Sequence, residues 1–140
     1  SMKRDVVLSI QGRQHYGDQE PETIELVTEG TMEFRDGGWD ITYEESELTG
    51  LEGTKTTVKL DGKTVTLIRT GTFPSHMLFS EDERHVGLYQ TPIGQDMTIA
   101  THTSHVCNTV GENGGRLVID YTVEVDNSLM GEHHFEMVVS

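Results

Sequence analysis

Cysteine and long apolar runs are scarce in this sequence, and each scarcity excludes a class of protein. The chain of 140 residues has one cysteine, Cys107, so it cannot form an internal disulfide, which fits a reducing compartment. No apolar run approaches the roughly 20 residues of a membrane-spanning helix. Met2-Lys3-Arg4 begins like a signal peptide, but the apolar stretch Val6 to Ile10 that follows is too short. We therefore expect a cytoplasmic protein with no membrane partner.

Basic residues and catalytic motifs are also lacking. Ten Lys and Arg stand against 24 Asp and Glu, which gives a net charge of −14. Such a surface repels phosphate backbones and anionic membranes, so nucleic acid is not an expected partner. The sequence contains no Gly-x-Ser-x-Gly, Cys-x-x-Cys, phosphate-loop or His-Glu-x-x-His pattern. We expect neither a cofactor nor an enzyme on these grounds, although catalysis stays open as an alternative below.

What the sequence does contain is alternation of apolar and polar residues. Ile24, Leu26, Met32 and Phe34 share one parity, whereas polar residues dominate the other, which is typical of a strand with one buried face. Asp36-Gly37 then predicts a two-residue hairpin turn. That turn would place Phe34 opposite Trp39 and Met32 opposite Ile41, with all four side chains on the inner face.

Further turns divide the rest of the chain in the same way. Asp61-Gly62 predicts a hairpin with Val58 opposite Val65 and Thr56 opposite Leu67. Pro92-Ile93-Gly94 and Asn113-Gly114-Gly115 predict two more turns, and a looser one is expected around 126–131. One helical turn is expected within 73–81. Inward-facing positions in the last two strands are expected at Leu117, Ile119, Tyr121, Val123, Val125, Phe135, Met137 and Val139.

This pattern predicts an all-β fold. We expect eight to ten strands, nearly all joined by short turns, in a single antiparallel up-and-down meander barrel. The barrel should occupy residues 2–140 as one domain, with Ser1 as a tag remnant.

Several segments resemble the YwiB-like bacterial proteins of unknown function. The first is Glu44-Glu45-Ser46-Glu47-Leu48-Thr49-Gly50-Leu51-Glu52-Gly53-Thr54-Lys55-Thr56. The others are Arg69-Thr70-Gly71, Ser75-His76-Met77-Leu78-Phe79, Tyr89-Gln90-Thr91-Pro92-Ile93-Gly94 and Tyr121-Thr122-Val123-Glu124-Val125. The resemblance implies a calycin-type barrel, the broad group that includes lipocalins and fatty-acid-binding proteins, and it implies no activity.

Two charged residues have the parity of inward-facing positions. Arg69 follows Val65 and Leu67, and Glu45 follows Tyr43. An inward charge is costly unless it is paired, so the two residues could pair with each other or close the barrel end near Trp39. Alternatively, Arg69 receives a carboxylate or phosphate of a ligand, or extends to solvent.

Three hypotheses for function follow. The first is a module that binds a small hydrophobic or anionic ligand through the inward residues Trp39, Tyr43, Glu45, Arg69, Tyr121 and His133. The second is a filled barrel that acts as a structural or protein-interaction module. The third is an enzyme in which His133 and Glu45 serve as acid and base. The first is preferred, because the sequence has no catalytic motif.

The histidines do not predict a metal site. His102 and His105 differ by three positions, so on one regular strand they would point to opposite faces, and the same holds for the adjacent His133 and His134. A site assembled across strands from His102, His133 or His76 with an acid is a weaker alternative, and we expect no metal.

Overall fold

The computed structural model describes residues 2–90 and 95–140, and strands dominate it. Among these residues, the one helical element is the 3-10 turn η1 (Glu47–Thr49), and no helix is long and apolar enough to cross a membrane. The ten strands are β1 (Lys3–His15), β2 (Glu22–Arg35), β3 (Gly38–Glu44), β4 (Thr54–Asp61), β5 (Thr64–Gly71), β6 (Ser75–Phe79), β7 (Arg84–Gln90), β8 (Asp96–Asn108), β9 (Gly115–Val125) and β10 (Ser128–Val139).

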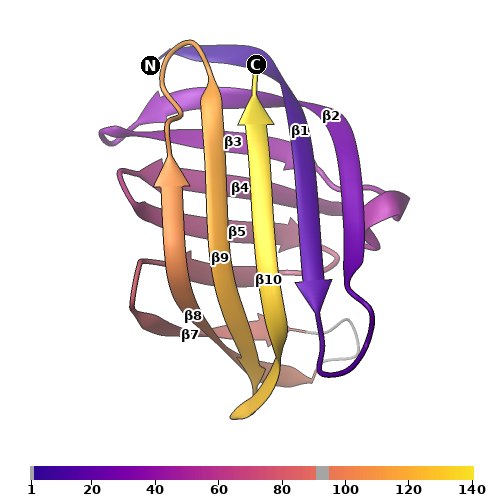
Figure 1. Ribbon diagram of the computed structural model, residues 1–140. Helices are drawn as coiled ribbons and strands as arrows, with labels where there is room; N and C mark the ends of the chain where they lie inside the picture. Colours follow the sequence, from indigo (N-terminus) through magenta and orange to yellow (C-terminus); the bar gives the residue numbers. More distant parts are fainter. Residues whose placement is uncertain (1, 91–94) are drawn as a thin grey trace.

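The strands form one closed antiparallel barrel, as the sequence predicted. Each strand pairs with its neighbours in the sequence, and β1 pairs with β10 from Leu8 opposite Val139 to His15 opposite Glu132. Figure 1 shows β8, β9, β10 and β1 across the front, with β3 to β7 running behind them at a steep angle. Closure leaves no sheet edge along β1 or β10 that could pair with another chain.

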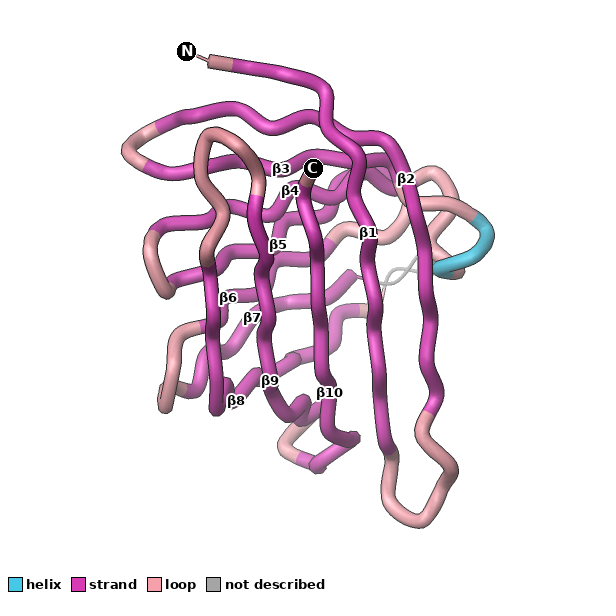
Figure 2. Tube along the Cα trace, turned by 45° about the horizontal axis from the view of Figure 1, so that its top comes forward, coloured by secondary structure: helices cyan, strands magenta, loops and turns pink. Residues whose placement is uncertain are grey.

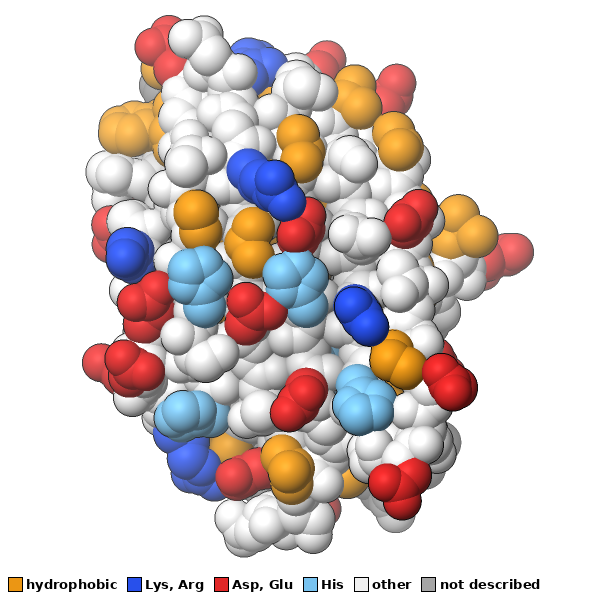
Figure 3. Space-filling view, viewed as in Figure 1, with side chains coloured by type: hydrophobic (Ala, Val, Ile, Leu, Met, Phe, Trp, Pro, Cys, Tyr) orange, Lys and Arg blue, Asp and Glu red, His pale blue; other side chains and the backbone are white. Residues whose placement is uncertain are grey.

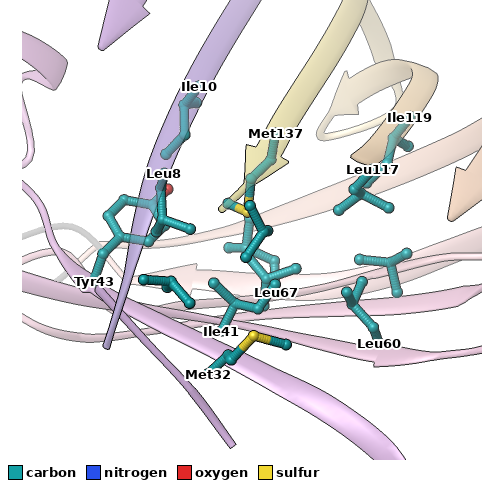
Figure 4. Close-up of a cluster of buried hydrophobic side chains, with 14 of the residues drawn as sticks. Leu8, Ile10, Met32, Ile41, Tyr43, Leu60, Leu67, Leu117, Ile119 and Met137 are labelled. Carbon is teal, nitrogen blue, oxygen red and sulfur yellow. The ribbon is translucent and has the colours of Figure 1, made fainter. Parts of the chain in front are cut away.

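The core follows from the alternation. Inward side chains of nearly every strand are buried, and outward ones are mostly exposed. Figure 4 shows side chains from the front and back of the barrel meeting in one cluster. Its fully buried members include Leu8, Met32, Ile41, Leu117 and Met137. The barrel is therefore filled by apolar side chains over much of its length.

The first predicted hairpin register is confirmed. Phe34 lies opposite Trp39 and Met32 opposite Ile41, and both Asp36 and Gly37 have positive φ, as a type I′ turn requires. The rings of Phe34 and Trp39 meet edge to face with centroids 5.1 Å apart. Phe34 is nevertheless 41% exposed and Trp39 half-buried, so this pair closes one end of the barrel rather than filling its centre.

The second predicted hairpin register is wrong by two positions. Val58 lies opposite Leu67, not Val65, and Thr56 lies opposite Arg69. The turn is centred on Gly62 and Lys63, because Gly62 takes the positive φ at the first turn position. A shift of two positions leaves every side chain on its predicted face.

Three smaller expectations have different outcomes. The segment 73–81 contains strand β6 rather than a helical turn, because its inward residues Ser75 and Phe79 alternate with outward ones. The turn at Asn113-Gly114-Gly115 is confirmed by the connection between β8 and β9. The looser turn is in fact a tight one at Asp126 and Asn127, both with positive φ. The predicted turn at Pro92-Ile93-Gly94 lies outside the described residues.

The direction of the strands separates two ends of the barrel. Since successive strands run in opposite directions, the connections after β1, β3, β5 and β9 lie at one end, and both termini lie at the other (Figure 2). We call the first the polar end, because its inward side chains include Glu45, Thr56, Arg69 and Ser75. The second is called the termini end.

Candidate functional site

The polar end contains a buried ion pair, as one sequence interpretation predicted. The guanidinium Nε of Arg69 lies 3.7 Å from Oε2 of Glu45, whose side chain is 2% exposed. Thr56 is fully buried and donates its hydroxyl proton to the same carboxylate oxygen at 2.5 Å. Arg69 Nε in turn lies 3.4 Å from the Thr56 hydroxyl oxygen. These contacts hold one side of the guanidinium and leave its terminal nitrogens, Nη1 and Nη2, without an acceptor among the described residues.

Two tyrosines border this pair. Burial, and after it the charge of Glu45, raises the pKa of Tyr43, whose hydroxyl lies beside Glu45 and Thr56. Tyr121 comes from the opposite wall, and burial raises the pKa of its hydroxyl to about 12 even though nearby Arg69 acts in the opposite direction. The Tyr121 ring crosses the interior to contact Phe79, with centroids 4.7 Å apart. Both hydroxyls therefore stay protonated at neutral pH.

Two further hydroxyls are buried without a partner. Thr103 is 0% exposed and Ser75 is 7% exposed, and neither hydroxyl oxygen has a hydrogen-bond partner among the described residues. Ser75 is the strand partner of Arg69, and Thr103 is the strand partner of Tyr121. Strand partners share a face, so both hydroxyls point into the barrel beside these residues. Buried polar groups are nearly always hydrogen-bonded, so each exception is informative. The two positions lie apart, because Ser75 begins β6 whereas the Thr103 carbonyl accepts from the Asp82 N–H, in the connection after β6, at 2.8 Å. Of the two, Ser75 lies beside Arg69 at the polar end.

A cleft of about 670 Å³ opens beside Tyr121 and is lined by β1, β8, β9, β10 and the loop after β1. One part of its wall is aromatic, because His133 stacks on Tyr121 with centroids 5.0 Å apart and an interplanar angle of 10°. Tyr16 also contacts His133, in an edge-to-face arrangement with centroids 5.7 Å apart. Burial lowers the pKa of His133, so this imidazole is neutral at pH 7.

His134 lies on the outer face, as the parity predicted, and its environment is the opposite of that around His133. Its Nδ1 contacts a carboxylate oxygen of Asp120, and its Nε2 lies 2.9 Å from Oε1 of Glu136. These two hydrogen bonds raise the pKa of His134, because both ring N–H groups then have an anionic acceptor. Figure 3 shows histidine and acidic side chains next to each other on this face.

The predicted site residues are only partly brought together. Tyr43, Glu45, Arg69 and Tyr121 gather at the polar end, and His133 joins them through its stack on Tyr121. Trp39 does not, since it lies near the start of β3 at the termini end, where it lines a separate groove with Met32. The alternative in which the ion pair closes the barrel end near Trp39 is therefore wrong.

The histidine analysis needs one correction. His102 and His105 are both exposed on the outer face, because a β-bulge between Thr103 and His105 shifts the register by one residue. Across residues 2–90 and 95–140, no three His, Cys, Asp or Glu side chains gather as metal ligands. Sequence reasoning also missed Thr56, Ser75 and Thr103. Their inward parity was a usable signal, but their hydrogen-bonding state was not readable from it.

Comparison with known proteins gives the family but no activity. A family model described as a domain of unknown function (DUF1934) matches residues 8–137. The chain belongs to this family. It is also similar to the crystal structure of the ywiB protein from Bacillus subtilis, with a TM-score of 0.82 and 18% sequence identity. The match covers 99% of this chain and 92% of that one, and at this identity it shows the fold alone. No curated protein matches the chain.

Proposed function

We propose that this DUF1934 protein is a non-enzymatic binding module that takes a small molecule with an oxyanion group, a carboxylate or phosphate, at the polar end. The observation that carries the proposal is the buried, unpartnered hydroxyl of Ser75 beside the half-satisfied guanidinium of Arg69, its strand partner. An oxyanion would accept hydrogen bonds from both groups. In free protein, each unpaired buried hydroxyl costs about 1–3 kcal/mol.

Arg69 is suited to this role because its contact with Glu45 does not use the two terminal guanidinium nitrogens. The contact of 3.7 Å runs through Nε, so the two terminal nitrogens remain for a planar, bidentate interaction. The protonated hydroxyl of Tyr121 is a further donor near Arg69. Glu45 balances the guanidinium charge in the free protein, so the site does not bury an unpaired cation.

The ligand also meets an aromatic surface. The cleft of about 670 Å³ lies in the range of small-molecule sites, and the neutral His133 ring stacked on Tyr121 forms part of its wall. A ligand with an apolar or planar portion beside its oxyanion fits this combination. The calycin-type group suggested by the sequence resemblance supports small-ligand binding by analogy only.

The expected setting is part of the same proposal. The single cysteine supports a cytoplasmic location, and the net charge of −14 argues against nucleic acid and anionic membranes as partners. The alternative is a filled barrel that acts as a structural or protein-interaction module. It is supported by the packed core of the termini end, and it predicts that no ligand binds. His133 and Glu45 have separate sets of contacts, so an acid–base pair between them has little support.

The test is thermal unfolding with a panel of small carboxylates and phosphates. A ligand that binds the folded state adds about 2.7 kcal/mol to the free energy of unfolding at a hundredfold excess over Kd. The melting temperature rises accordingly. We expect that rise in the wild type and in Arg84→Met, whose arginine forms an exposed pair with Glu124 at 3.0 Å. We expect none in Arg69→Met. Equal shifts in both variants, or no shift with any anion, would reject the proposal.

A further inference from the structure

The first part of β2 has an open edge. β1 pairs with β2 over residues 22–33, whereas β3 pairs with β2 only over residues 31–35. Residues 22–30 therefore have a strand on one side and, within the part of the chain that the structure describes, none on the other. Figure 2 shows this part of β2 at the margin of the barrel, running down to the loop after β1.

The backbone of this segment presents unpaired hydrogen-bonding groups. The Phe34 N–H donates to the Met2 carbonyl at 2.9 Å, so the even-numbered residues of β2 bond toward β1. Successive residues of an antiparallel strand bond to opposite sides. The N–H and C=O groups of Glu25 and Val27 therefore face the open side, where no described strand meets them. The Val27 side chain is 72% exposed, so the edge is open to solvent there.

Repulsion between like charges accounts for the end of the ladder between β2 and β3. Two positions beyond its last pair, the same register would set Glu29 opposite Glu44, with both side chains on the outer face. Like charges directly opposite each other on neighbouring strands are destabilising. β3 instead continues beside β4, with Glu44 opposite Lys55. Carboxylates therefore border the open edge on both sides.

The surroundings of the open edge are acidic. Lys and Arg are absent from residues 14–34 and 44–54. The exposed acids without an ion-pair partner among the described residues include Glu22, Glu25 and Glu29 on β2 and Glu44 at the end of β3. Arg13 on β1 and Lys55 on β4 each lie one strand away from the open side. A strand added here would meet an excess of negative charge.

We infer that the open edge of β2 binds an extended basic segment of another protein, which joins the sheet as an antiparallel strand. Its backbone would pair with Glu25 and Val27, and its outward Lys or Arg side chains would lie beside Glu25 and Glu29. Its inward side chains would be apolar, because they would cover the half-buried Leu26 and Ile24, which is 38% exposed. A second copy of this chain would bring the same acidic edge and a net charge of −14, so charge favours a basic partner. The inference is independent of the anion site at Arg69.

The test uses a synthetic peptide of about seven residues in which Lys alternates with Val, long enough to span residues 23–29. Amide exchange is followed by NMR. At roughly a tenfold excess of peptide over Kd, exchange of the Glu25 and Val27 N–H groups should slow about tenfold, while the Leu26 N–H, which faces β1, should change little. This alternation distinguishes strand pairing from diffuse attraction between opposite charges. Binding without protection at Glu25 and Val27, or no binding, would overturn the inference.

Two N-methylated peptides give a matched control that leaves the protein unchanged. The peptide residues opposite Glu25 and Val27 are Lys, and their N–H groups point toward β2, whereas the N–H groups of the Val residues point away. N-methylation of the Lys residues should therefore abolish binding, and N-methylation of the Val residues should change affinity by less than about threefold. Equal effects of the two modifications would exclude an added strand.

Variants test the charge and the identity of the partner. Glu29→Gln and Glu44→Gln should each weaken binding of the Lys peptide about two- to fivefold, whereas Glu112→Gln, exposed at the termini end, should not. A peptide with Glu in place of Lys should not bind. Sedimentation of the wild type without peptide should give a monomer. A dimer that is lost in Val27→Pro, which removes an edge N–H, would assign the edge to a second copy and overturn the inference.

Discussion

The buried hydroxyl of Thr103 tests, in the free protein, whether an unpartnered polar group lowers the free energy of unfolding. Thr103→Val replaces that hydroxyl with a methyl group of similar shape at a position that is 0% exposed. Since the hydroxyl has no partner among the described residues, the folded state carries its desolvation cost, about 1–3 kcal/mol. We therefore expect Thr103→Val to increase the free energy of unfolding by about 1–2 kcal/mol, although most substitutions at buried positions reduce it.

Thr56 supplies the matched control. It is also 0% exposed and inward-facing, but its hydroxyl donates to Oε2 of Glu45 at 2.5 Å. Thr56→Val removes a hydrogen bond to a buried carboxylate, so it should reduce the free energy of unfolding by about 2–3 kcal/mol. The two substitutions are chemically identical, but the Thr56 hydroxyl has Glu45 and Arg69 as partners and the Thr103 hydroxyl has none among the described residues.

Urea unfolding followed by circular dichroism measures both effects. The reasoning predicts opposite signs for the two variants. If Thr103→Val is destabilised as strongly as Thr56→Val, its hydroxyl has a partner in the folded protein, and the reasoning from unpartnered buried hydroxyls fails.

Three further results are expected. In a double-mutant cycle of Arg69→Met and Glu45→Gln, urea unfolding should give a coupling of about 2 kcal/mol, and a coupling below about 0.5 kcal/mol would show that the pair is not energetically linked. The raised pKa of His134 predicts that stability depends on pH. The contribution of His134 to the free energy of unfolding is fully present below the unfolded pKa of about 6.5 and is lost as pH rises through the higher folded pKa. An NMR titration of His134 with a midpoint below about 6.5 would contradict this. Gly87→Ala should reduce the free energy of unfolding by about 1–3 kcal/mol, because a Cβ there would lie 2.4 Å from the His76 carbonyl oxygen. Gly12→Ala is the control and should have little effect, because a Cβ there would have nothing within 4 Å. Equal thermal stability of the two variants would exclude the close contact.

The fold was predictable because alternation and turn chemistry are local. Parity gave the correct face even at the second hairpin, where the predicted register was wrong, since an error of two positions preserves the face. It failed at His105, because the preceding bulge inserts one residue and no local signal in the sequence marks it.

The site was predictable only in part, because parity gives the face of a residue and not its position along the barrel axis. Trp39 and Glu45 share a face, but six residues of strand separate them by roughly 20 Å. The ion pair of Arg69 with Glu45 was accessible because an inward charge needs a partner. The unpartnered state of Ser75 and Thr103 was not, since it depends on which groups the distant strands bring near them.

The central claim is that the polar end binds an oxyanion, and an NMR titration of isotope-labelled protein with octanoate tests it most directly. The Nε–H of Arg69 reports on the polar end, and the indole N–H of Trp39, the one tryptophan of the chain, reports on the termini end. We predict saturable shifts of the Arg69 resonance and of the Ser75 amide, with the Trp39 indole unchanged. Shifts centred on Trp39, or none at Arg69, would contradict the account.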